Sequence, residues 1–523
     1  MSLTMTMLVL SPVAAVICIF WRLVYNIYFH PLAKFPGPWY AGATSLSLAL
    51  ISIRKTELEW LMGLVEKYGT ESPIRITPDL LLFPNPKYLR DIYRDPELNT
   101  KSDSYSSGAL GPPNLFTITD PERHRKLRKA LVGPHWTIGA LKKTWEPHLD
   151  ELIELFIEKM TDHSQAGEEV EICQKLAEFA ADFLTIIAFG ESWGFVRNGR
   201  DERAFLQSWR EGLPYFGFAG RWRTFRNYIL KSPVFSPYFL PSASDKRGIG
   251  FLVSHAAQQI SIRENKIAES NGEWKMDNPD FLQHCLDARF PDGSPLTYAD
   301  KHAHITFLFQ AGADTTGTAL GCTVRYLLTH PSALQRARRE IHEADAAGQL
   351  SRPVLSYDES RRHLPYLAAC VREALRLSPP AANQFSRVVP AGGRRIGGGG
   401  GAFVPGGANV VANQYVVGRD PALWAPDPHA FRPERWLNDD GNDAAAREAR
   451  LEAVGFAFGM GARACGGRDI AGLELAKLLP EVLRNFDVEL RDPGRFVCAG
   501  GVAYNEGLRV VLARRGSGVK SAD

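Results

Sequence analysis

The sequence lacks the cysteine pairs that a zinc ribbon or a disulfide framework needs. Its seven cysteines are scattered over 523 residues, are odd in number, and include no C-x-x-C spacing. It also lacks a charge imbalance, because the formal net charge is only +3. Composition therefore gives no reason to expect a nucleic-acid partner or a strongly acidic substrate, and the cysteine usage fits a reducing compartment.

No internal repeat is visible, and nothing after the first 39 residues marks a clear domain boundary. Apolar residues at spacings of three and four, as in LDELIELFIEKM (149–160), predict helices from residue 40 to about residue 390. GGGGG (397–401) is expected to be a turn, and NDDGND (438–443) a polar surface loop. The fold class is predicted to be mainly α with minor β, and the strand-like segments are short and late in the chain: 402–405, 409–417 and 507–513.

The first 21 residues carry no charge, and they are apolar from Met7 onward. As a helix this segment reaches about 30 Å, the hydrocarbon thickness of a bilayer. Arg22 and Lys34 follow it, and the positive-inside rule assigns that side to the cytosol. A cleaved signal peptide lacks support, because there is no basic n-region and no small-x-small cleavage site. A buried core helix is disfavoured because proline-rich sequence follows immediately. An uncleaved single-pass anchor over residues 1–28 is therefore expected.

The stretch FHPLAKFPGPW (29–39) follows, with three prolines and a glycine. These residues cannot continue a helix, so a stiff extended neck is expected that holds the body close to the membrane surface. The predicted organisation is anchor 1–28, neck 29–39, one helix-rich domain over 40–515, and a flexible tail over 516–523.

One cysteine, Cys465, stands in the run FGMGARACGG (458–467). The spacing Gly459-x-Gly461-x-x-Ala464 is formally a dinucleotide fingerprint, but a cysteine interrupts the turn that such a fingerprint requires. A nucleophilic cysteine needs a histidine partner, and none lies nearby in sequence, although a distant one stays open. A cysteine that only fills the core does not require glycines on both sides.

Glycines let the backbone come close to a flat object, and backbone N–H groups aimed at sulfur stabilise a thiolate. Arg463 is suited to bind a carboxylate, and the helix-like RDIAGLELAKLLPEVL (468–483) directs its positive dipole end at Cys465. A thiolate, a flat neighbour and a carboxylate partner together describe an iron porphyrin with its propionates.

The pattern Phe458-x-x-Gly461-x-Arg463-x-Cys465-x-Gly467-x-x-x-Ala471 resembles the haem-binding signature of the cytochrome P-450 family. The resemblance implies the family's helix-rich fold with small β-sheets and haem b as cofactor. It implies that Cys465 is the axial ligand of the haem iron and that Arg463 binds a propionate. Phe458 and Gly459 belong to the same cofactor-binding loop.

Two further segments resemble family landmarks behind the haem. LPYLAACVREALRLSP (364–379) carries Glu373 and Arg376, which alone would be an ordinary solvated pair. FRPERW (431–436) supplies Arg435. The resemblance implies that the three form a buried structural triad, and losing one member of such a triad should damage folding.

FLFQAGADTTGTALGCTVRYLL (307–328) is an apolar helix interrupted by small and polar residues. These residues are compatible with close helix packing alone, but threonine can also bond back to a carbonyl and distort a helix. The segment is similar to the family's oxygen-activating groove. The resemblance implies that Thr315 hydrogen-bonds dioxygen or its water, and that Asp314 relays protons from solvent.

DPERHRKLRKAL (120–131) places His124 and Arg128 four residues apart, on one helical face. It resembles the family's propionate-binding helix, and Arg387 in FSRVVP is a further candidate propionate partner. A solvated basic helix is the alternative. The other basic residues of this helix are placed to face an acidic electron donor.

The resemblance implies a membrane-bound haem-thiolate monooxygenase (EC 1.14) that uses O2. Its electrons come from NADPH through a separate NADPH–cytochrome P-450 reductase, because the chain shows no flavin or nicotinamide domain. YFHPLAKFPGPW resembles fungal microsomal members, which implies the endoplasmic reticulum membrane with the catalytic domain in the cytosol. A haem-thiolate isomerase or peroxygenase and a non-catalytic haem sensor are the alternatives.

The substrate is expected to be sizeable and largely apolar, such as a fungal secondary metabolite. This expectation depends on the aromatic and small residues of the segments that the resemblance assigns to the pocket wall. They are 102–116, 215–225, Phe307, 380–385 and 499–505.

Overall fold

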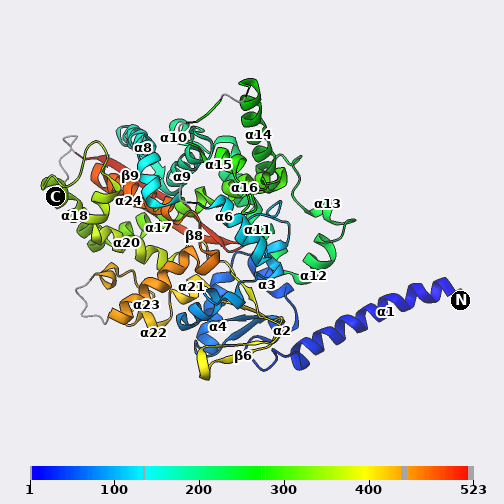
Figure 1. Ribbon diagram of the computed structural model, residues 1–523. Coiled ribbons are helices and arrows are strands. Elements are labelled where there is room, and N and C mark those ends of the chain that lie inside the picture. The colour runs from blue at the N-terminus through cyan, green and yellow to red at the C-terminus, as the bar shows by residue number, and fades with distance from the viewer. Residues whose placement is uncertain (1–2, 134–135, 272–273, 277, 438–443, 516–523) are drawn as a thin grey trace.

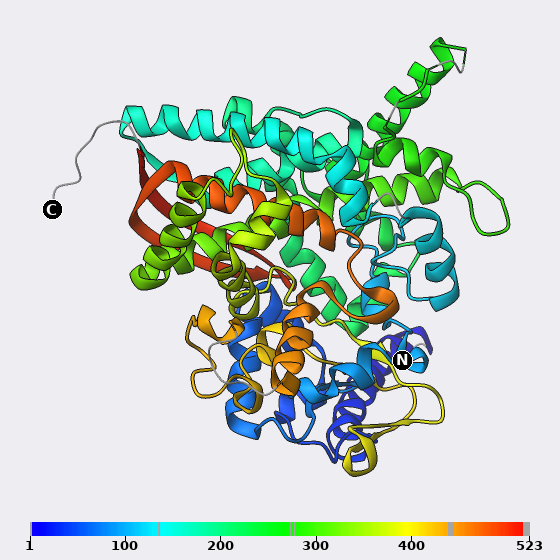
Figure 2. The same ribbon diagram turned by 60° about the vertical axis from the view of Figure 1, so that its left-hand side comes forward.

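A computed structural model describes residues 3–133, 136–271, 274–276, 278–437 and 444–515. The predicted polar loop 438–443 and the predicted flexible tail 516–523 therefore lie outside the described residues. Figure 1 shows a large helical part, with α8, α9 and α14, and a smaller part with short strands, near α2, α4 and β6. The turned view in Figure 2 keeps these two parts distinct. The predicted fold class, mainly α with minor β, is confirmed.

The helices of the first half of the chain are α1 Leu3–Val24, α2 Trp39–Ala43, α3 Leu46–Ile53, α4 Glu57–Tyr68, α5 Leu89–Tyr93, α6 Pro121–Leu131, α7 Ile138–Thr144, α8 Glu146–Ala166, α9 Ile172–Phe189, α10 Phe195–Asn198, α11 Phe205–Arg221, α12 Arg223–Phe225, α13 Ser236–Phe239 and α14 Gly248–Glu269. Those of the second half are α15 Phe281–Asp287, α16 Tyr298–Ala311, α17 Ala313–Thr329, α18 Pro331–Ala346, α19 Tyr357–His363, α20 Pro365–Leu377, α21 Gln414–Val417, α22 Pro421–Trp424, α23 Ala444–Gly455 and α24 Arg468–Asn485.

Three small sheets join segments that are far apart in the sequence. The first has the order β1 (Ile74–Thr77), β2 (Leu80–Leu82), β7 (Asn409–Val411) and β4 (Arg387–Val388), with β2 and β7 parallel through Leu80 and Asn409. The second has the order β3 (Glu169–Glu171), β9 (Val502–Arg514) and β8 (Phe486–Ala499). The third is the antiparallel pair β5 (Arg394–Ile396) and β6 (Ala402–Val404), and the predicted glycine turn connects its strands.

The predicted strand over 409–417 is wrong in its second half. Strand β7 ends at Val411, and α21 begins at Gln414 because the Asn413 side chain accepts hydrogen bonds from the N–H groups of Tyr415 and Val416. Asparagine in this N-cap position starts a helix even in a sequence rich in valine. The early strands β1, β2 and β3 were not predicted; they are three or four residues long, and β2 and β3 pair with late strands.

Helix α17 is the central element of the helical part. Most of its residues are buried, and it packs against α9, α20 and strand β9. The predicted interruption of this long apolar segment occurs at Gly312, where α16 ends and α17 begins. A Cβ atom added to Gly312 would lie 2.4 Å from Leu184 Cδ1, so a larger residue there would displace the Leu184 side chain of α9. The same close packing brings the polar residues after Gly312 into the interior.

The segment predicted to be the anchor is helical in the structure as α1, and Figure 1 shows it projecting away from the rest of the molecule. Within the part of the chain that the structure describes, no helix combines the length and the apolar character needed to cross a bilayer.

Candidate functional site

The loop around Cys465 is a tight backbone turn that exposes one sulfur. It follows the 3-10 helix η12 (Gly461–Arg463) and leads directly into α24. The Cys465 N–H donates to the Phe458 carbonyl oxygen at 2.7 Å, and the Gly467 N–H donates to Cys465 Sγ at 3.3 Å. Gly459 has a φ of +70°, which favours glycine. The loop thus holds Sγ at the start of a helix with a backbone donor aimed at it.

Several influences act on the ionisation of this thiol. Desolvation raises the pKa of Cys465, and the Gly467 N–H and the Arg128 guanidinium oppose this rise. Arg128, from α6, donates from Nη1 to the Ala464 carbonyl oxygen at 2.8 Å. Backbone donors and a nearby cation are the environment in which a sulfur acts as an anionic metal ligand.

Four predicted propionate partners gather with a residue that was not predicted. Arg463 donates to the carbonyl oxygens of Asn99 and Thr119, both at 3.3 Å, and of Ile118 at 3.2 Å. Lys101, which sequence reasoning missed, donates from Nζ to the Phe116 carbonyl oxygen at 2.6 Å. The members of this group, called here the cation cluster, are Lys101, His124, Arg128, Arg387 and Arg463.

Lys101, His124 and Arg387 are buried, Arg128 and Arg463 are partly buried, and the members of the cation cluster act on one another. Burial lowers the pKa of His124 to about 3, with further contributions from Arg463 and Lys101. Burial and Arg387 lower the pKa of Arg463 to about 10, and burial lowers the pKa of Lys101 well below its usual value. Among the described residues, no carboxylate forms an ion pair with any member of the cluster.

Gathering cations away from water is costly, so a negatively charged group between the members would stabilise the cluster. A porphyrin carries two propionate groups, and Cys465 offers a sulfur that could bind its iron. The donor set therefore fits haem: a sulfur with a backbone donor, and cations without carboxylate partners beside it. Arg128 links the two parts, because it contacts the cysteine loop and belongs to the cluster.

Removing the Lys101 charge tests this assignment. We expect Lys101→Met to lose haem to an acceptor apoprotein about tenfold faster, because a charge-assisted hydrogen bond contributes about 1.5 kcal/mol or more. The measurement is the rate of haem transfer, followed by absorbance. Lys129→Met removes the same charge from an exposed position on α6 and should leave the rate unchanged. Equal rates in the two variants would contradict a role for Lys101 in haem binding.

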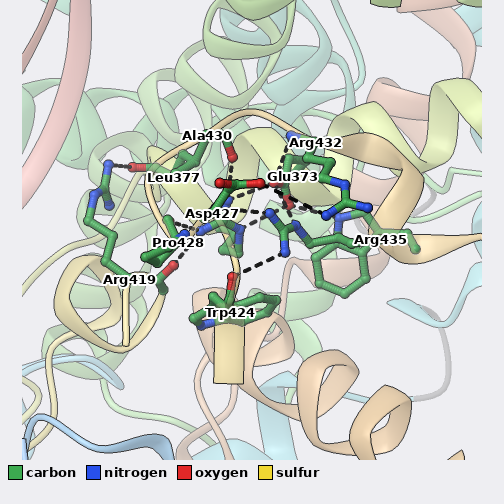
Figure 3. A network of polar contacts seen from close by, with 12 residues as sticks. Glu373, Leu377, Arg419, Trp424, Asp427, Pro428, Ala430, Arg432 and Arg435 are labelled. Atoms are coloured by element: carbon green, nitrogen blue, oxygen red, sulfur yellow. Dashed lines mark hydrogen bonds and ion pairs between the residues drawn. The ribbon is translucent and has the colours of Figure 1, made fainter. Parts of the chain in front are cut away.

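A second polar network is built around the Glu373 carboxylate (Figure 3). The Arg376 guanidinium forms two hydrogen bonds with the Glu373 carboxylate, Nη2 to Oε1 at 2.6 Å and Nε to Oε2 at 2.9 Å. Arg435 Nε donates to the same Oε1 at 2.9 Å, and the Trp436 indole N–H donates to Oε2 at 3.0 Å. Glu373 and Arg376 are 0% exposed.

The remaining donors of this network are also satisfied. Arg376 Nη1 donates to the carbonyl oxygens of Gly418 and Pro428, both at 2.6 Å, and Nη2 donates to that of Ala430 at 2.8 Å. The network joins α20, the segment 418–430 and the 3-10 helix η9 (Pro433–Trp436). A buried triad with its donors paired in this way is a structural lock, which is what the resemblance implies for these three residues.

The interruption between α16 and α17 places Thr315 on an accessible face. Thr315 Oγ1 donates to the Ala311 carbonyl oxygen at 2.8 Å, the back-bond expected for a threonine at a distorted helix. Phe307, Ala311 and Thr315 follow one another at intervals of four residues and are all partly exposed, whereas Asp314 and Thr316 are buried. One face of this helix pair therefore borders open space and carries the Thr315 hydroxyl.

Asp314 is held by a residue that the sequence analysis missed. Arg210, on α11, donates to the Asp314 carboxylate from Nη2 at 2.7 Å and from Nε at 3.0 Å. Its Nη1 donates to Gln174 Oε1 at 2.9 Å. The Asp314 carboxylate is thus directed at α11, so a proton that passes through it must pass a buried ion pair. The two partners are 104 residues apart, and no local sequence signal marks Arg210.

The structure thus brings Cys465, Arg463, His124, Arg128 and Arg387 to one site, with Phe458 and Gly459 in the loop itself. Phe458 is partly buried and packs against the main core. Thr315 and Asp314 lie on the helix pair α16–α17, and Glu373, Arg376 and Arg435 form the separate network of Figure 3. The functional roles of these residues stay predictions.

Comparisons with known proteins agree with this geometry. A family model described as Cytochrome P450 matches residues 94–499. Among curated proteins, the chain is 30% identical over 504 residues to Cytochrome P450 monooxygenase gsfF of Penicillium aethiopicum, covering 94% of this chain and 95% of that protein. It is also 30% identical over 491 residues to Cytochrome P450 monooxygenase esdpH of Penicillium shearii, covering 92% and 94%.

Among solved structures, the fold resembles a crystal structure titled as a cytochrome P450 (CYP102L1). The TM-score is 0.69 at 19% identity, and the match covers 88% of this chain and 94% of that chain. This likeness establishes the fold and agrees with the two curated relatives.

Proposed function

The chain belongs to the cytochrome P450 family and is a haem-thiolate monooxygenase, and from this premise we propose that it oxidises a largely apolar compound of fungal secondary metabolism. The class of reaction requires O2, an electron donor and an organic substrate. The proposal for the substrate is supported by the fungal source of the relatives and by aromatic side chains at the accessible helix face. The single observation that carries the assignment of the site is the Cys465 loop next to a cation cluster without carboxylate partners.

The cofactor is proposed to be haem b, held by Cys465 through its sulfur and by the cation cluster through its propionates. When bound, haem supplies the iron centre at which O2 is activated with electrons from the donor. The Gly467 N–H hydrogen bond and the dipole of α24 favour the anionic form of Cys465. His124, whose pKa is lowered by burial and then by the neighbouring cations, is an uncharged donor, and the arginines and Lys101 supply the charge.

Thr315 and Asp314 are proposed to manage protons on the accessible helix face. The Thr315 hydroxyl donates to the Ala311 carbonyl in the resting arrangement, and its oxygen remains available to accept a hydrogen bond from water. Asp314 is paired with Arg210 and orients the helix turn that carries Thr315. Protons are expected to reach this turn when the Arg210 contact opens.

Replacing single threonines of α17 by alanine tests the role of Thr315. We expect Thr315→Ala to divert about nine-tenths of the consumed NADPH to hydrogen peroxide or water, since proton delivery contributes on the order of 10²-fold or more to such steps. Thr323→Ala is the matched control, because Thr323 makes the same bond to the carbonyl four residues earlier, at 2.8 Å. The ratio of product to NADPH consumed should fall in the first variant alone, and a fall in neither variant would contradict the role.

We further propose that NADPH–cytochrome P450 reductase is the electron donor and that α1 attaches the protein to the endoplasmic reticulum membrane, with the catalytic domain in the cytosol. The exposed basic residues of α6, among them Arg125, Lys126 and Lys129, support an acidic partner. In fractionated fungal cells, the full chain should pellet with microsomes and a chain lacking residues 1–28 should shift toward the supernatant. Equal distribution of the two chains would contradict the anchor.

The function is tested by measuring NADPH-dependent O2 consumption by the haem-loaded chain together with the reductase. Extracts of cells with and without the gene are compared to find the substrate. We expect one metabolite to disappear and an oxygenated product to form, and 18O2 should label that product. Turnover without NADPH would instead favour an isomerase or peroxygenase. A normal haem spectrum without substrate-dependent NADPH consumption would favour a sensor.

A further inference from the structure

The segment Asn114–Thr117 is a turn whose backbone N–H groups are all paired. The Asn114 side chain accepts from the N–H groups of Phe116 at 3.0 Å and Thr117 at 3.2 Å, and Thr117 Oγ1 accepts from the Asn114 N–H at 2.9 Å. The one donor that the turn itself leaves over is the Leu115 N–H. It donates to His304 Nε2, on α16, at 3.1 Å. His304 thus supplies the acceptor that completes the turn.

The geometry fixes the tautomer of His304. Its Nδ1 lies 2.5 Å from the Asp300 carbonyl oxygen, so Nδ1 carries the proton and Nε2 is the acceptor. Burial lowers the pKa of His304, which keeps the ring neutral. A second side chain of α16 holds the same loop, because Gln310 Nε2 donates to the Leu110 carbonyl oxygen at 3.0 Å.

On its other side the turn contacts the cation cluster. The Phe116 carbonyl oxygen accepts from Lys101 Nζ, and the carbonyl oxygen of Ile118, the residue directly after the turn, accepts from Arg463 Nη1. The turn therefore lies between the residues assigned to the propionates and the helix that leads to Thr315. It is anchored on both sides, by cations at its carbonyl groups and by His304 at its N–H.

The side chain that this turn presents is Phe116. Its ring is stacked on that of Phe307, with centroids 5.9 Å apart and planes at 11°. Phe307 lies eight residues before Thr315 on the same partly exposed helix face. Two aromatic rings in this position form an apolar wall beside the place where the substrate is oxidised.

We propose that His304 is a positioning residue for substrate specificity: its Nε2 holds the Asn114–Thr117 turn, so that Phe116 closes the pocket wall against Phe307. The pair then selects the shape of the apolar part of the substrate. This inference rests on the proposed function, in which the loop 102–116 and Phe307 line the substrate pocket. His304 contacts neither cofactor nor substrate and acts through Phe116.

Two substitutions by an amide side chain distinguish the roles of the two ring nitrogens of His304. Glutamine places its amide near the position of Nε2, and asparagine places it near that of Nδ1. His304→Asn therefore keeps the contact with Asp300 and loses the contact with Leu115, whereas His304→Gln retains the contact with Leu115. Phe116→Ala removes the ring and leaves the turn intact.

The measurements use the haem-loaded full chain and two small haem ligands, imidazole and 4-phenylimidazole. In His304→Asn, we expect the Leu115 amide to exchange hydrogen about fivefold faster or more, the fold-change of one neutral hydrogen bond. The Kd for 4-phenylimidazole, titrated by its spectral shift, should rise about fivefold, and that for imidazole should change less than twofold. His304→Gln should match the wild type in both measurements. Phe116→Ala should lose 4-phenylimidazole affinity with the Leu115 amide still protected.

Unchanged exchange at Leu115 in His304→Asn would overturn the proposal, as would an equal loss of affinity for both ligands. If His304→Asn does not load haem, the comparison of wild type with Phe116→Ala decides, and equal 4-phenylimidazole affinity there overturns the proposal. Neither readout needs turnover. A failure of the proposed function, seen as absent NADPH-dependent oxidation, is therefore distinguishable from a failure of this inference.

Discussion

Glu373→Gln is expected to yield no folded, haem-loaded protein. The carboxylate of Glu373 is the only negative group in contact with the guanidinium groups of Arg376 and Arg435 within the described part of the chain, and it also accepts from the Trp436 indole. Glutamine offers one acceptor oxygen in place of two and no charge. Two guanidinium groups, 0% and 3% exposed, are then left without an anion.

Removing one partner of a buried ion pair costs about 3–5 kcal/mol, and this pair has a third member. A typical domain has a free energy of unfolding of about 5–15 kcal/mol, so this loss removes a large part of the stability of the folded state. The measurement is the yield of soluble chain together with its haem content at matched expression.

Glu434→Gln is the matched control for this prediction. Glu434 belongs to the neighbouring helix η9 and pairs with Arg336 at 3.4 Å, but both side chains are about 40% exposed. An exposed pair contributes about 0–1 kcal/mol, so this variant should fold and load haem. Normal haem loading of Glu373→Gln would mean that the triad is not the lock that the geometry indicates.

The sequence was sufficient to predict the position of residues whose partners lie in the same local motif. The glycines around Cys465 and the helix start after it are local features, and the structure has the loop and α24 where they were expected. The interruption at Gly312 is local too, because glycine, aspartate and threonine within an apolar helix indicate it. Helical periodicity likewise predicted the helix over 149–160, which lies within α8.

The sequence was insufficient where a partner comes from a distant segment. Arg210 reaches Asp314 across 104 residues, and Lys101 joins the cation cluster from a loop with no basic motif. A single lysine in a loop is usually solvated, so no local pattern separates Lys101 from its neighbours. The same holds for β2, which becomes a strand by pairing with β7 more than 300 residues later. Such contacts follow from the tertiary fold and not from propensity.

Cys465→Ala is expected to abolish oxygenation and the long-wavelength Soret band of the reduced carbon-monoxide complex. That band depends on a thiolate ligand to the haem iron, and Cys465 would supply the sulfur, which the loop leaves exposed. The fold should survive, because the Cys465 contact that closes the loop is its backbone N–H to the Phe458 carbonyl oxygen. Alanine retains that bond.

The measurement is the difference spectrum of reduced protein with and without carbon monoxide, normalised to haem content. Cys498→Ala is the control, because it removes a second sulfur, buried in β8, and should leave the band in place. Cys465→Ser sharpens the comparison, since its hydroxyl can still accept from the Gly467 N–H but is not a thiolate. A wild-type spectrum in Cys465→Ala would contradict the assignment of Cys465 as the iron ligand, and another residue would have to be the ligand. Because the cation cluster fixes the side of the site on which the propionates bind, the search for that ligand would begin among the residues that face the cluster.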